Sequence, residues 1–206
     1  MKVLLVNGSP HAHGCTYTAL QEIAQTLNQE GIESTLFQVG TKPLSGCLGC
    51  GRCKDKGKCV MDDVVNEFLN VAASYDAYIF GAPVHFASAN GAMIAFMDRV
   101  FSAGKQVLTF KPAAAIVSCR RAGSTATFDQ LNKYFAIRHM PIVTSQYWNQ
   151  VHGNTPEEVR RDLEGMQTMR SLGRNMAWIL KCIEAGRQSG ILHPEHETQI
   201  KTNFAR

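Results

Sequence analysis

Four of the seven cysteines in this 206-residue chain lie in one short polar segment, with the spacing C-x2-C-x2-C-x5-C. The segment runs from Cys47 through Cys50 and Cys53 to Cys59, and glycines and lysines fill most of the gaps. Four thiolates from one loop can bind an iron–sulfur cluster, zinc also accepts four cysteines, and unligated thiols are the third alternative. The compact spacing favours a cluster over zinc, whose ligand pairs are usually separated by a longer segment.

A second candidate site lies between Gly8 and Thr16, where a glycine-, serine- and proline-containing segment follows an apolar run. Glycine lets backbone amides approach an anion, Ser9 and Thr16 add hydroxyl donors, and a following helix adds its positive N-terminal end. The segment has neither the G-x-G-x-x-G dinucleotide pattern nor the lysine of a Walker loop. It therefore predicts a cradle for a single terminal phosphate, and an ordinary turn before a helix is the alternative.

Two further loops carry rings and charged donors. Residues 81–90 include Pro83, His85 and Phe86, and such a loop can hold a flat ring system with its backbone amides near the polar edge of the ring. Residues 118–124 include Arg120 and Gly123, and the arginine would stabilise negative charge on a reduced ring. Each loop alone is a weak signal, because most such loops simply connect elements. Together with the first loop they are a stronger signal, because all three loops would lie at one edge of the same predicted sheet.

Predicted strands and predicted helices alternate five times along the chain, and these elements must position the loops. We expect strands at 2–7, 32–39, 76–80, 112–119 and 141–144, and helices at 16–29, 64–73, 91–101, 125–137 and 157–185. This alternation predicts an α/β fold, a doubly wound five-stranded parallel sheet with helices on both faces. Ligands of such folds bind outside the carboxyl ends of the strands. We expect one domain at 1–185, with the cysteine loop inserted at 43–60, and a tail at 186–206.

The composition of the chain argues against a membrane-spanning, a secreted or a nucleic-acid-binding protein. The chain is 45% hydrophobic and 18% charged, with a formal net charge of +4 and a mean hydropathy of −0.14. No apolar run approaches the ~18 residues of a membrane span, and the first residues lack the pattern of a secretory signal. The positive residues are scattered rather than clustered. We therefore expect a cytoplasmic protein that binds neither nucleic acid nor membrane, and whose cysteines are ligands or catalytic groups rather than disulfides.

The ordered motifs G-S-P…G-x-T and G-A-P-V-x-F…M-x-x-F-x-D-R resemble those of the flavodoxin-like NAD(P)H-dependent FMN reductases. The cysteine spacing resembles that of the iron–sulfur flavoproteins within this superfamily, as does the later segment at 164–170. The resemblance covers roughly residues 1–185. The matching residues are Gly8, Ser9, Pro10, Gly14, Thr16, Gly81, Ala82, Pro83, Val84, Phe86, Met93, Phe96, Asp98 and Arg99.

The resemblance implies which residues bind FMN. The phosphate is expected on Ser9, His11, Cys15 and Thr16. The isoalloxazine ring is expected against Pro83, Val84, His85 and Phe86, with Arg120 and Gly123 on its other side. In the family Arg or Lys often stands where this chain has His11, Asn where it has Cys15, and Tyr where it has His85. A neutral imidazole and a thiol are weaker phosphate partners, so FMN affinity is expected to be lower.

The resemblance also implies an activity, namely an FMN-dependent oxidoreductase that passes electrons from NAD(P)H through the flavin to a small-molecule or flavin acceptor. It needs no nucleophilic residue. The alternative is an electron carrier in which Cys47, Cys50, Cys53 and Cys59 hold a [4Fe-4S] cluster that exchanges electrons with ferredoxin-like partners. A zinc- or thiol-bearing regulatory module is a third. Members of the family usually form homodimers or homotetramers, and Tyr147 and Trp148 could cap a neighbouring flavin site or anchor the last helix.

Overall fold

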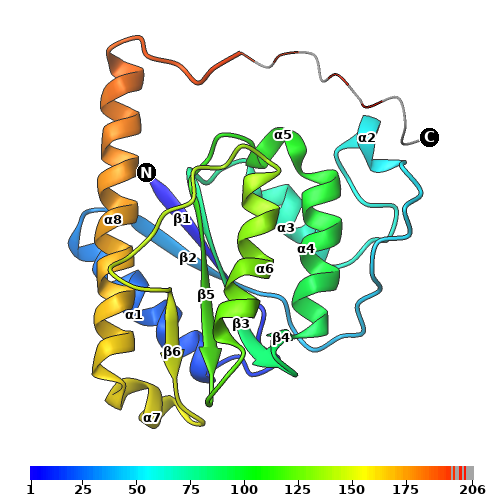
Figure 1. Cartoon of the computed structure of the whole chain (residues 1–206). Coiled ribbons are helices and arrows are strands. Elements are labelled where there is room, and N and C mark those ends of the chain that lie inside the picture. Colours follow the sequence, from blue (N-terminus) through cyan, green and yellow to red (C-terminus); the bar gives the residue numbers. More distant parts are fainter. Residues whose placement is uncertain (196, 198–199, 201, 203–206) are drawn as a thin grey trace.

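The computed structural model describes residues 1–195, 197, 200 and 202, and a parallel sheet lies at its centre (Figure 1). The strands are β1 Lys2–Asn7, β2 Glu33–Gln38, β3 Ala77–His85, β4 Ser88–Ala89, β5 Ala113–Cys119 and β6 Gln150–His152. Five of them pair in parallel in the order β2-β1-β3-β5-β6, while β4 makes a short antiparallel pair with the end of β3. This is the flavodoxin-like order, so the predicted fold class is confirmed, with one short additional strand.

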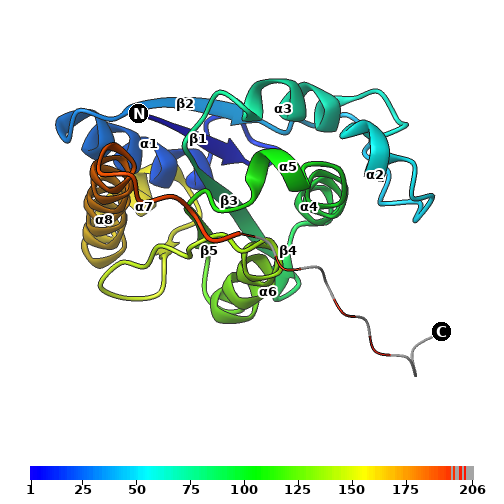
Figure 2. The same ribbon diagram turned by 90° about the horizontal axis from the view of Figure 1, so that it is seen from above.

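Helices cover both faces of the sheet, as Figure 2 shows. They are α1 Cys15–Gln29, α2 Cys53–Lys56, α3 Val64–Ala72, α4 Gly91–Ala103, α5 Lys105–Leu108, α6 Ser124–Ala136, α7 Pro156–Arg161 and α8 Leu163–Gln188. The helices α1 and α8 pack against each other on one face, while α3, α4 and α6 cover the other. Among the described residues, no helix combines the length and the apolar character that crossing a membrane requires.

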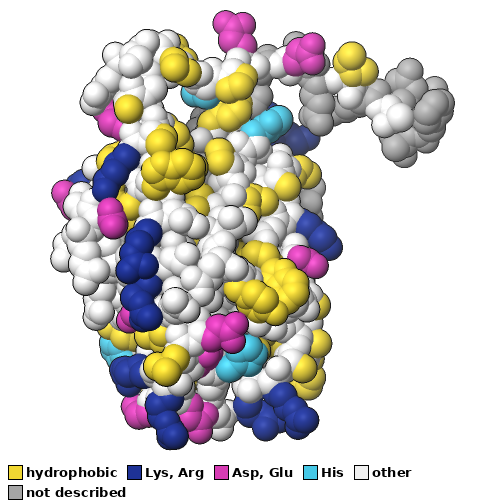
Figure 3. All heavy atoms as spheres, turned by 60° about the vertical axis from the view of Figure 1, so that its left-hand side comes forward, with side chains coloured by type: hydrophobic (Ala, Val, Ile, Leu, Met, Phe, Trp, Pro, Cys, Tyr) yellow, Lys and Arg dark blue, Asp and Glu magenta, His cyan; other side chains and the backbone are white. Residues whose placement is uncertain are grey.

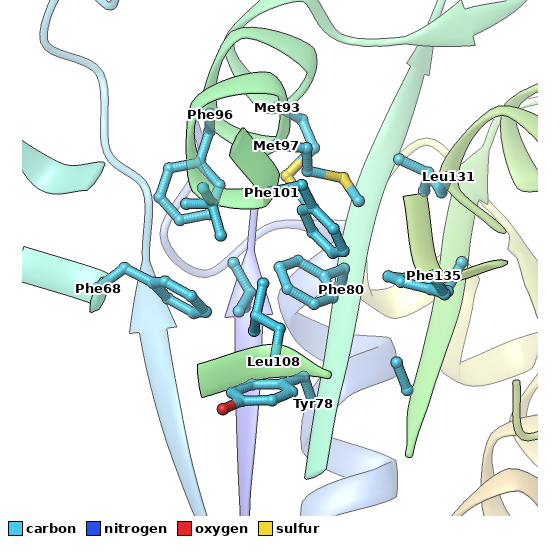
Figure 4. Packing of buried hydrophobic residues seen from close by; sticks show 14 of the residues in the cluster. Phe68, Tyr78, Phe80, Met93, Phe96, Met97, Phe101, Leu108, Leu131 and Phe135 are labelled. Atoms are coloured by element: carbon cyan, nitrogen blue, oxygen red, sulfur yellow. The ribbon is translucent and has the colours of Figure 1, made fainter. Parts of the chain in front are cut away.

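The buried aromatic residues are gathered on the face that α3, α4 and α6 cover (Figure 4). Phe68 of α3 lies with its ring centroid 5.4 Å from that of Phe96 on α4, and Phe80 of β3 lies 5.5 Å from Phe135 on α6. All of β5 from Ala113 to Cys119 is buried, and every residue but Ser118 is apolar, because helices cover this strand on both faces. This packing makes the strands a rigid support for the loops at their carboxyl ends.

The last strand differs from the prediction. The segment 141–144 touches β5 through a single parallel bridge between Ala113 and Ile142, and its proline has no amide to donate. The chain then turns and pairs with β5 further along, so that β6 begins at Gln150. The buried Asn149 prepares this pairing, since its side-chain amide donates to the Ala115 carbonyl at 3.0 Å. The expected strand at 141–144 was therefore wrong, and the strand lies at Gln150–His152.

The expected single helix at 157–185 is also wrong, because the chain breaks at Asp162. This residue has φ −75° and ψ 82°, which ends α7, and its carboxylate accepts from the Gly165 amide at 3.0 Å as the N-cap of α8. The helix α8 then continues to Gln188. Of the expected tail at 186–206, residues 196, 198–199, 201 and 203–206 lie outside the described residues.

Candidate functional site

The loop between β1 and α1 is held in place by its own polar side chains. The Asn7 carboxamide oxygen accepts from the Ser9 amide at 3.1 Å, and its nitrogen donates to the Gln38 side chain at 2.7 Å. The Ser9 hydroxyl in turn accepts from the His11 amide at 3.1 Å. The loop is thus formed before any ligand binds, with the hydroxyl hydrogen of Ser9 still able to point outward.

The start of α1 has no side-chain cap. Gly14 occupies the N-cap position, where Ser, Thr, Asp or Asn would normally accept a hydrogen bond from the first helical amides. Those amides and the positive end of the helix dipole favour an anion at this point. The side chains here face inward: the Thr16 hydroxyl lies 2.7 Å from that of Ser118, and the Cys15 thiol donates to the Gly153 carbonyl at 3.7 Å. Partial burial raises the pKa of Cys15, which keeps it a neutral donor.

The loops after β3 and β5 face each other across an open hollow of about 510 Å³. The Phe86 ring is fully exposed, and its backbone has φ +53°, a conformation that bulky residues rarely adopt. Gly123 has φ +89°, and a Cβ there would lie 2.6 Å from the Ala87 Cα, so this close approach of the two loops requires glycine. The lining residues are Val84, Phe86, Ala87, Arg120, Arg121 and Ala122.

Two further contacts of the first loop limit what can be placed beside it. A Cβ on Gly8 would lie 2.6 Å from the Met93 sulfur, so the first loop packs too closely against α4 for a larger residue. The side-chain nitrogen of Asn90 donates to the Gly8 carbonyl at 2.8 Å, whereas its side-chain oxygen is buried without a partner. The Asn90 side-chain oxygen can therefore accept a hydrogen bond from a donor that the protein does not supply, such as a water or a ligand hydroxyl or N–H group.

The four clustered cysteines lie at the other end of α4. All four line one small hollow of about 30 Å³ together with Arg99 and Ser102. Cys47 and Cys50 are exposed, whereas Cys53 and Cys59 are half-buried. Within the described part of the chain, no three His, Cys, Asp or Glu side chains converge closely enough to hold a metal ion. Four thiols are a donor set that suits a cluster, but in this conformation they do not converge, so the loop would have to rearrange to bind one.

Comparison with known protein families shows the family to which this chain belongs. The model of the NADPH-dependent FMN reductases matches residues 1–155. The chain belongs to this family. An iron–sulfur flavoprotein of Methanocaldococcus jannaschii is 32% identical over 192 residues, covering 89% of this chain and all of the relative. The iron–sulfur flavoprotein of Methanosarcina thermophila is 23% identical, covering 91% of this chain and 99% of the relative. Both support the iron–sulfur flavoprotein-like subgroup predicted from the sequence.

Solved structures agree on the fold of this FMN reductase. An archaeal flavodoxin superposes with a TM-score of 0.60 at 14% identity, covering 88% of this chain and 99% of the other. A flavone reductase superposes with a TM-score of 0.67 at 16% identity, covering 89% of this chain and 64% of the other. The prediction of an FMN-dependent oxidoreductase that uses NAD(P)H is confirmed by the family. The assignment of individual site residues stays a prediction.

The sequence indicated Arg99 only as the last residue of a family motif, yet the reductase buries it completely. Its guanidinium makes two hydrogen bonds to the Asp63 carboxylate, at 2.7 and 2.9 Å, and further ones to the carbonyls of Ser45 and Met61. Burial alone would lower the pKa of Arg99, but the hydrogen bonds to Asp63 and to Cys59 together raise it. The pair thus closes the cysteine loop onto α4. The signal available in sequence was an arginine at an otherwise apolar helical position.

Two cysteines outside the loop were also located. Cys119 is buried at the end of β5. Cys182 is exposed on α8. None of the seven cysteines forms a disulfide.

Proposed function

We propose that FMN binds at the carboxyl edge of the sheet, with its phosphate on the first loop and its ring between the second and third loops. The residues are Ser9, His11, Cys15 and Thr16 for the phosphate, and Pro83, Val84, His85, Phe86, Arg120 and Gly123 for the ring. The observation that carries this proposal is that three loops distant in sequence meet there. Asn90 joins the second loop to the first, and Thr16 joins the first to the strand before the third.

Bound FMN would supply the hydride and electron chemistry, for which the side chains provide binding and electrostatics. The uncapped amides of α1 hold the phosphate, and the exposed face of Phe86 offers an apolar surface to the ring. Arg120 and Arg121 line the hollow and stabilise negative charge on the reduced ring. The imidazole of His85 is exposed to solvent, and it is not among the residues that line this hollow.

We also propose that Cys47, Cys50, Cys53 and Cys59 bind a [4Fe-4S] cluster that exchanges single electrons, which is the activity of an iron–sulfur flavoprotein. Its support is the shared hollow that the four cysteines line. The last turn of α4 lines this hollow, whereas the second of the proposed flavin loops ends just before its first residue, so the helix separates them by up to its length of 13 residues, ~20 Å at about 1.5 Å per residue. Figure 1 shows α2 and β4 near opposite ends of α4. The cluster therefore faces a different part of the surface from the flavin.

The electron partner is proposed to be ferredoxin-like or a small anionic acceptor. Beside Cys47 and Cys53 lies a hollow of about 520 Å³ lined by Lys54, Lys105 and Arg138, with no carboxylate among its described lining residues. Such a surface favours the encounter with an acidic partner and makes its rate dependent on salt. The protein would work in the cytoplasm, where its thiols stay reduced.

A homodimer or homotetramer is the proposed assembly. Hydrophobic side chains form patches between charged ones on the face that carries α8 (Figure 3). Trp178 on α8 is exposed, and Tyr147 and Trp148 before β6 are about half exposed. Such aromatic side chains are enriched at protein interfaces.

Anaerobic purification followed by quantitation of flavin, iron and zinc tests the function. About four irons and one FMN per chain would support both sites, and FMN without iron would leave a reductase with unligated cysteines.

Replacing Arg120 with Ala should weaken FMN binding without changing the iron content, whereas Cys50→Ser should lower the iron content without weakening FMN binding. An FMN titration with unaltered affinity in Arg120→Ala would contradict the proposed ring site, and Arg161→Ala on α7 is the matched control.

A further inference from the structure

Cys59 differs from the other three clustered cysteines in how it is held. The Arg99 Nε donates to the Cys59 sulfur at 3.3 Å. The buried Asn66 side chain accepts from the Cys59 amide at 2.9 Å and donates to its carbonyl at 3.0 Å. By contrast, Cys47 and Cys50 are exposed, and the Cys47 sulfur lies 4.0 Å from the Ser102 hydroxyl. One sulfur of the site is therefore fixed, while two others lie on an exposed loop.

The arginine cannot easily move away from this sulfur. Its side chain is completely buried, and four of its five contacts are to Asp63 and to the carbonyls of Ser45 and Met61. A guanidinium presents its donors in a rigid planar fork, so these contacts also fix the direction of Nε. The N–H that points at Cys59 is thus set by the packing of α4 against the loop.

We propose that Arg99 is a positioning residue of the cysteine site, which fixes Cys59 as the preformed ligand of the cluster and raises the reduction potential of that cluster. This inference rests on the proposed function, because it requires the cluster to be present. The other cysteines close onto the fixed sulfur when iron binds.

The sign of the effect on the potential follows from charge. Reduction adds one electron to the cluster, and part of that charge is spread over its sulfur ligands. A hydrogen bond from a cation to one of these sulfurs stabilises the reduced form more than the oxidised form, so the potential rises. Asp63 opposes the effect, because its carboxylate partly cancels the charge of Arg99. Loss of Arg99 should lower the potential, and loss of the Asp63 charge should raise it.

Three variants separate this role from a purely structural one. Arg99→Lys keeps a positive charge, but a single ammonium group cannot replace the fork that reaches both Asp63 and the sulfur. Asp63→Asn keeps one side-chain oxygen for the cap of α3 and for one hydrogen bond from Arg99, and it removes the opposing charge together with the second hydrogen bond. Asn66→Ala is the matched control, because it loosens the backbone of Cys59 while leaving the hydrogen bond to its sulfur.

The measurement is the midpoint potential of the cluster in anaerobically purified protein, titrated with dithionite and followed by electron paramagnetic resonance, together with iron content. Arg99→Lys should shift the potential to lower values, Asp63→Asn should shift it to higher values, and Asn66→Ala should lose iron without a shift. An unchanged potential in Arg99→Lys that retains its iron would overturn the proposal. So would equal shifts in Arg99→Lys and Asn66→Ala.

A second measurement needs no change at Arg99, in case its variant does not fold. Wild-type protein with 15N-labelled arginine should show a hyperfine coupling between the reduced cluster and a nitrogen. The coupling should persist in Arg138→Lys, because Arg138 lines the adjoining hollow rather than the one that Arg99 and the four cysteines share. Absence of the coupling in a protein with four irons would overturn the role of Arg99 alone. A wild-type protein without iron would instead overturn the proposed cluster, and with it this inference.

Discussion

The hydroxyl oxygens of Thr16 and Ser118 lie 2.7 Å apart, although 102 positions separate the two residues in the chain. Thr16 is in the first turn of α1, and Ser118 is near the carboxyl end of β5. Both are almost completely buried. The contact fixes the proposed phosphate loop relative to the strand that precedes the third of the proposed flavin loops, so the two halves of the proposed FMN site keep their spacing without ligand.

A double-mutant cycle can measure this contact. Thr16→Val leaves the Ser118 hydroxyl buried without a partner, which should lower the free energy of unfolding by about 1–3 kcal/mol. Adding Ser118→Ala removes the orphaned group, so the double variant should be no less stable than Thr16→Val. Urea unfolding of the FMN-free protein gives the comparison. Independent, additive losses in the two single variants would show that the hydroxyls do not interact.

Gly8→Ala should weaken FMN binding. The new Cβ would lie 2.6 Å from the Met93 sulfur and 3.0 Å from the Gly81 carbonyl oxygen, so the loop or α4 has to shift. A displaced phosphate loop should lose at least about tenfold in affinity, which corresponds to ~1.4 kcal/mol. Isothermal titration of FMN into the flavin-free protein measures it. Gly91→Ala at the start of α4 is the control, because its Cβ meets nothing within 4 Å; equal losses in both variants would refute the steric explanation.

The sequence predicted the order of elements and the edge at which the loops meet, because hydrophobic periodicity and strand alternation are local signals. It missed β6, since the more apolar segment at Pro141–Thr144 looks more like a strand than Gln150–His152 does. The position of β6 depends instead on Asn149, which bonds to Ala115 across the sheet. The break at Asp162 was missed for a related reason: a polar helix has the same periodicity on either side of an internal cap.

The candidate site was likewise predicted only in part from the sequence. The loops that carry Ser9, Phe86 and Arg120 could be placed at one edge from topology alone. The environment of Cys59 could not, because Arg99 is 40 positions away in sequence and reaches it only through the packing of α4. Tertiary contacts of this kind leave no periodic signal in a single sequence.

Cys119 should resist alkylation at pH 8. Burial raises the pKa of its thiol above the ordinary value, so little thiolate is present, whereas Cys182 is exposed. Iodoacetamide labelling followed by mass spectrometry should therefore modify Cys182 at least about tenfold faster. Comparable rates at both positions would contradict the burial of Cys119.

The same raised pKa gives a dependence of stability on pH. The folded protein keeps the Cys119 proton to a higher pH than the unfolded chain does. Its contribution to stability is complete below the unfolded thiol pKa of about 8.5, and it is lost as the pH rises through the folded value. Urea unfolding at rising pH should show a smaller loss of stability in Cys119→Ala than in the wild type.

Phe86→Gly should stabilise the flavin-free protein while weakening FMN binding. The φ of +53° costs a bulky residue roughly 1 kcal/mol, and an exposed ring gains nothing from burial in return, so glycine should be more stable in the absence of flavin. Loss of a ring that stacks on the flavin should cost about 0.5–1.5 kcal/mol, which is roughly a two- to tenfold weaker affinity. Thermal unfolding and FMN titration measure the two effects.

His139→Gly is the control for this prediction. Its backbone also has φ +53°, but it follows α6, so this variant should leave FMN affinity unchanged. If Phe86→Gly bound FMN as tightly as the wild type, the ring would not contact the flavin, and its strained exposure would need another explanation.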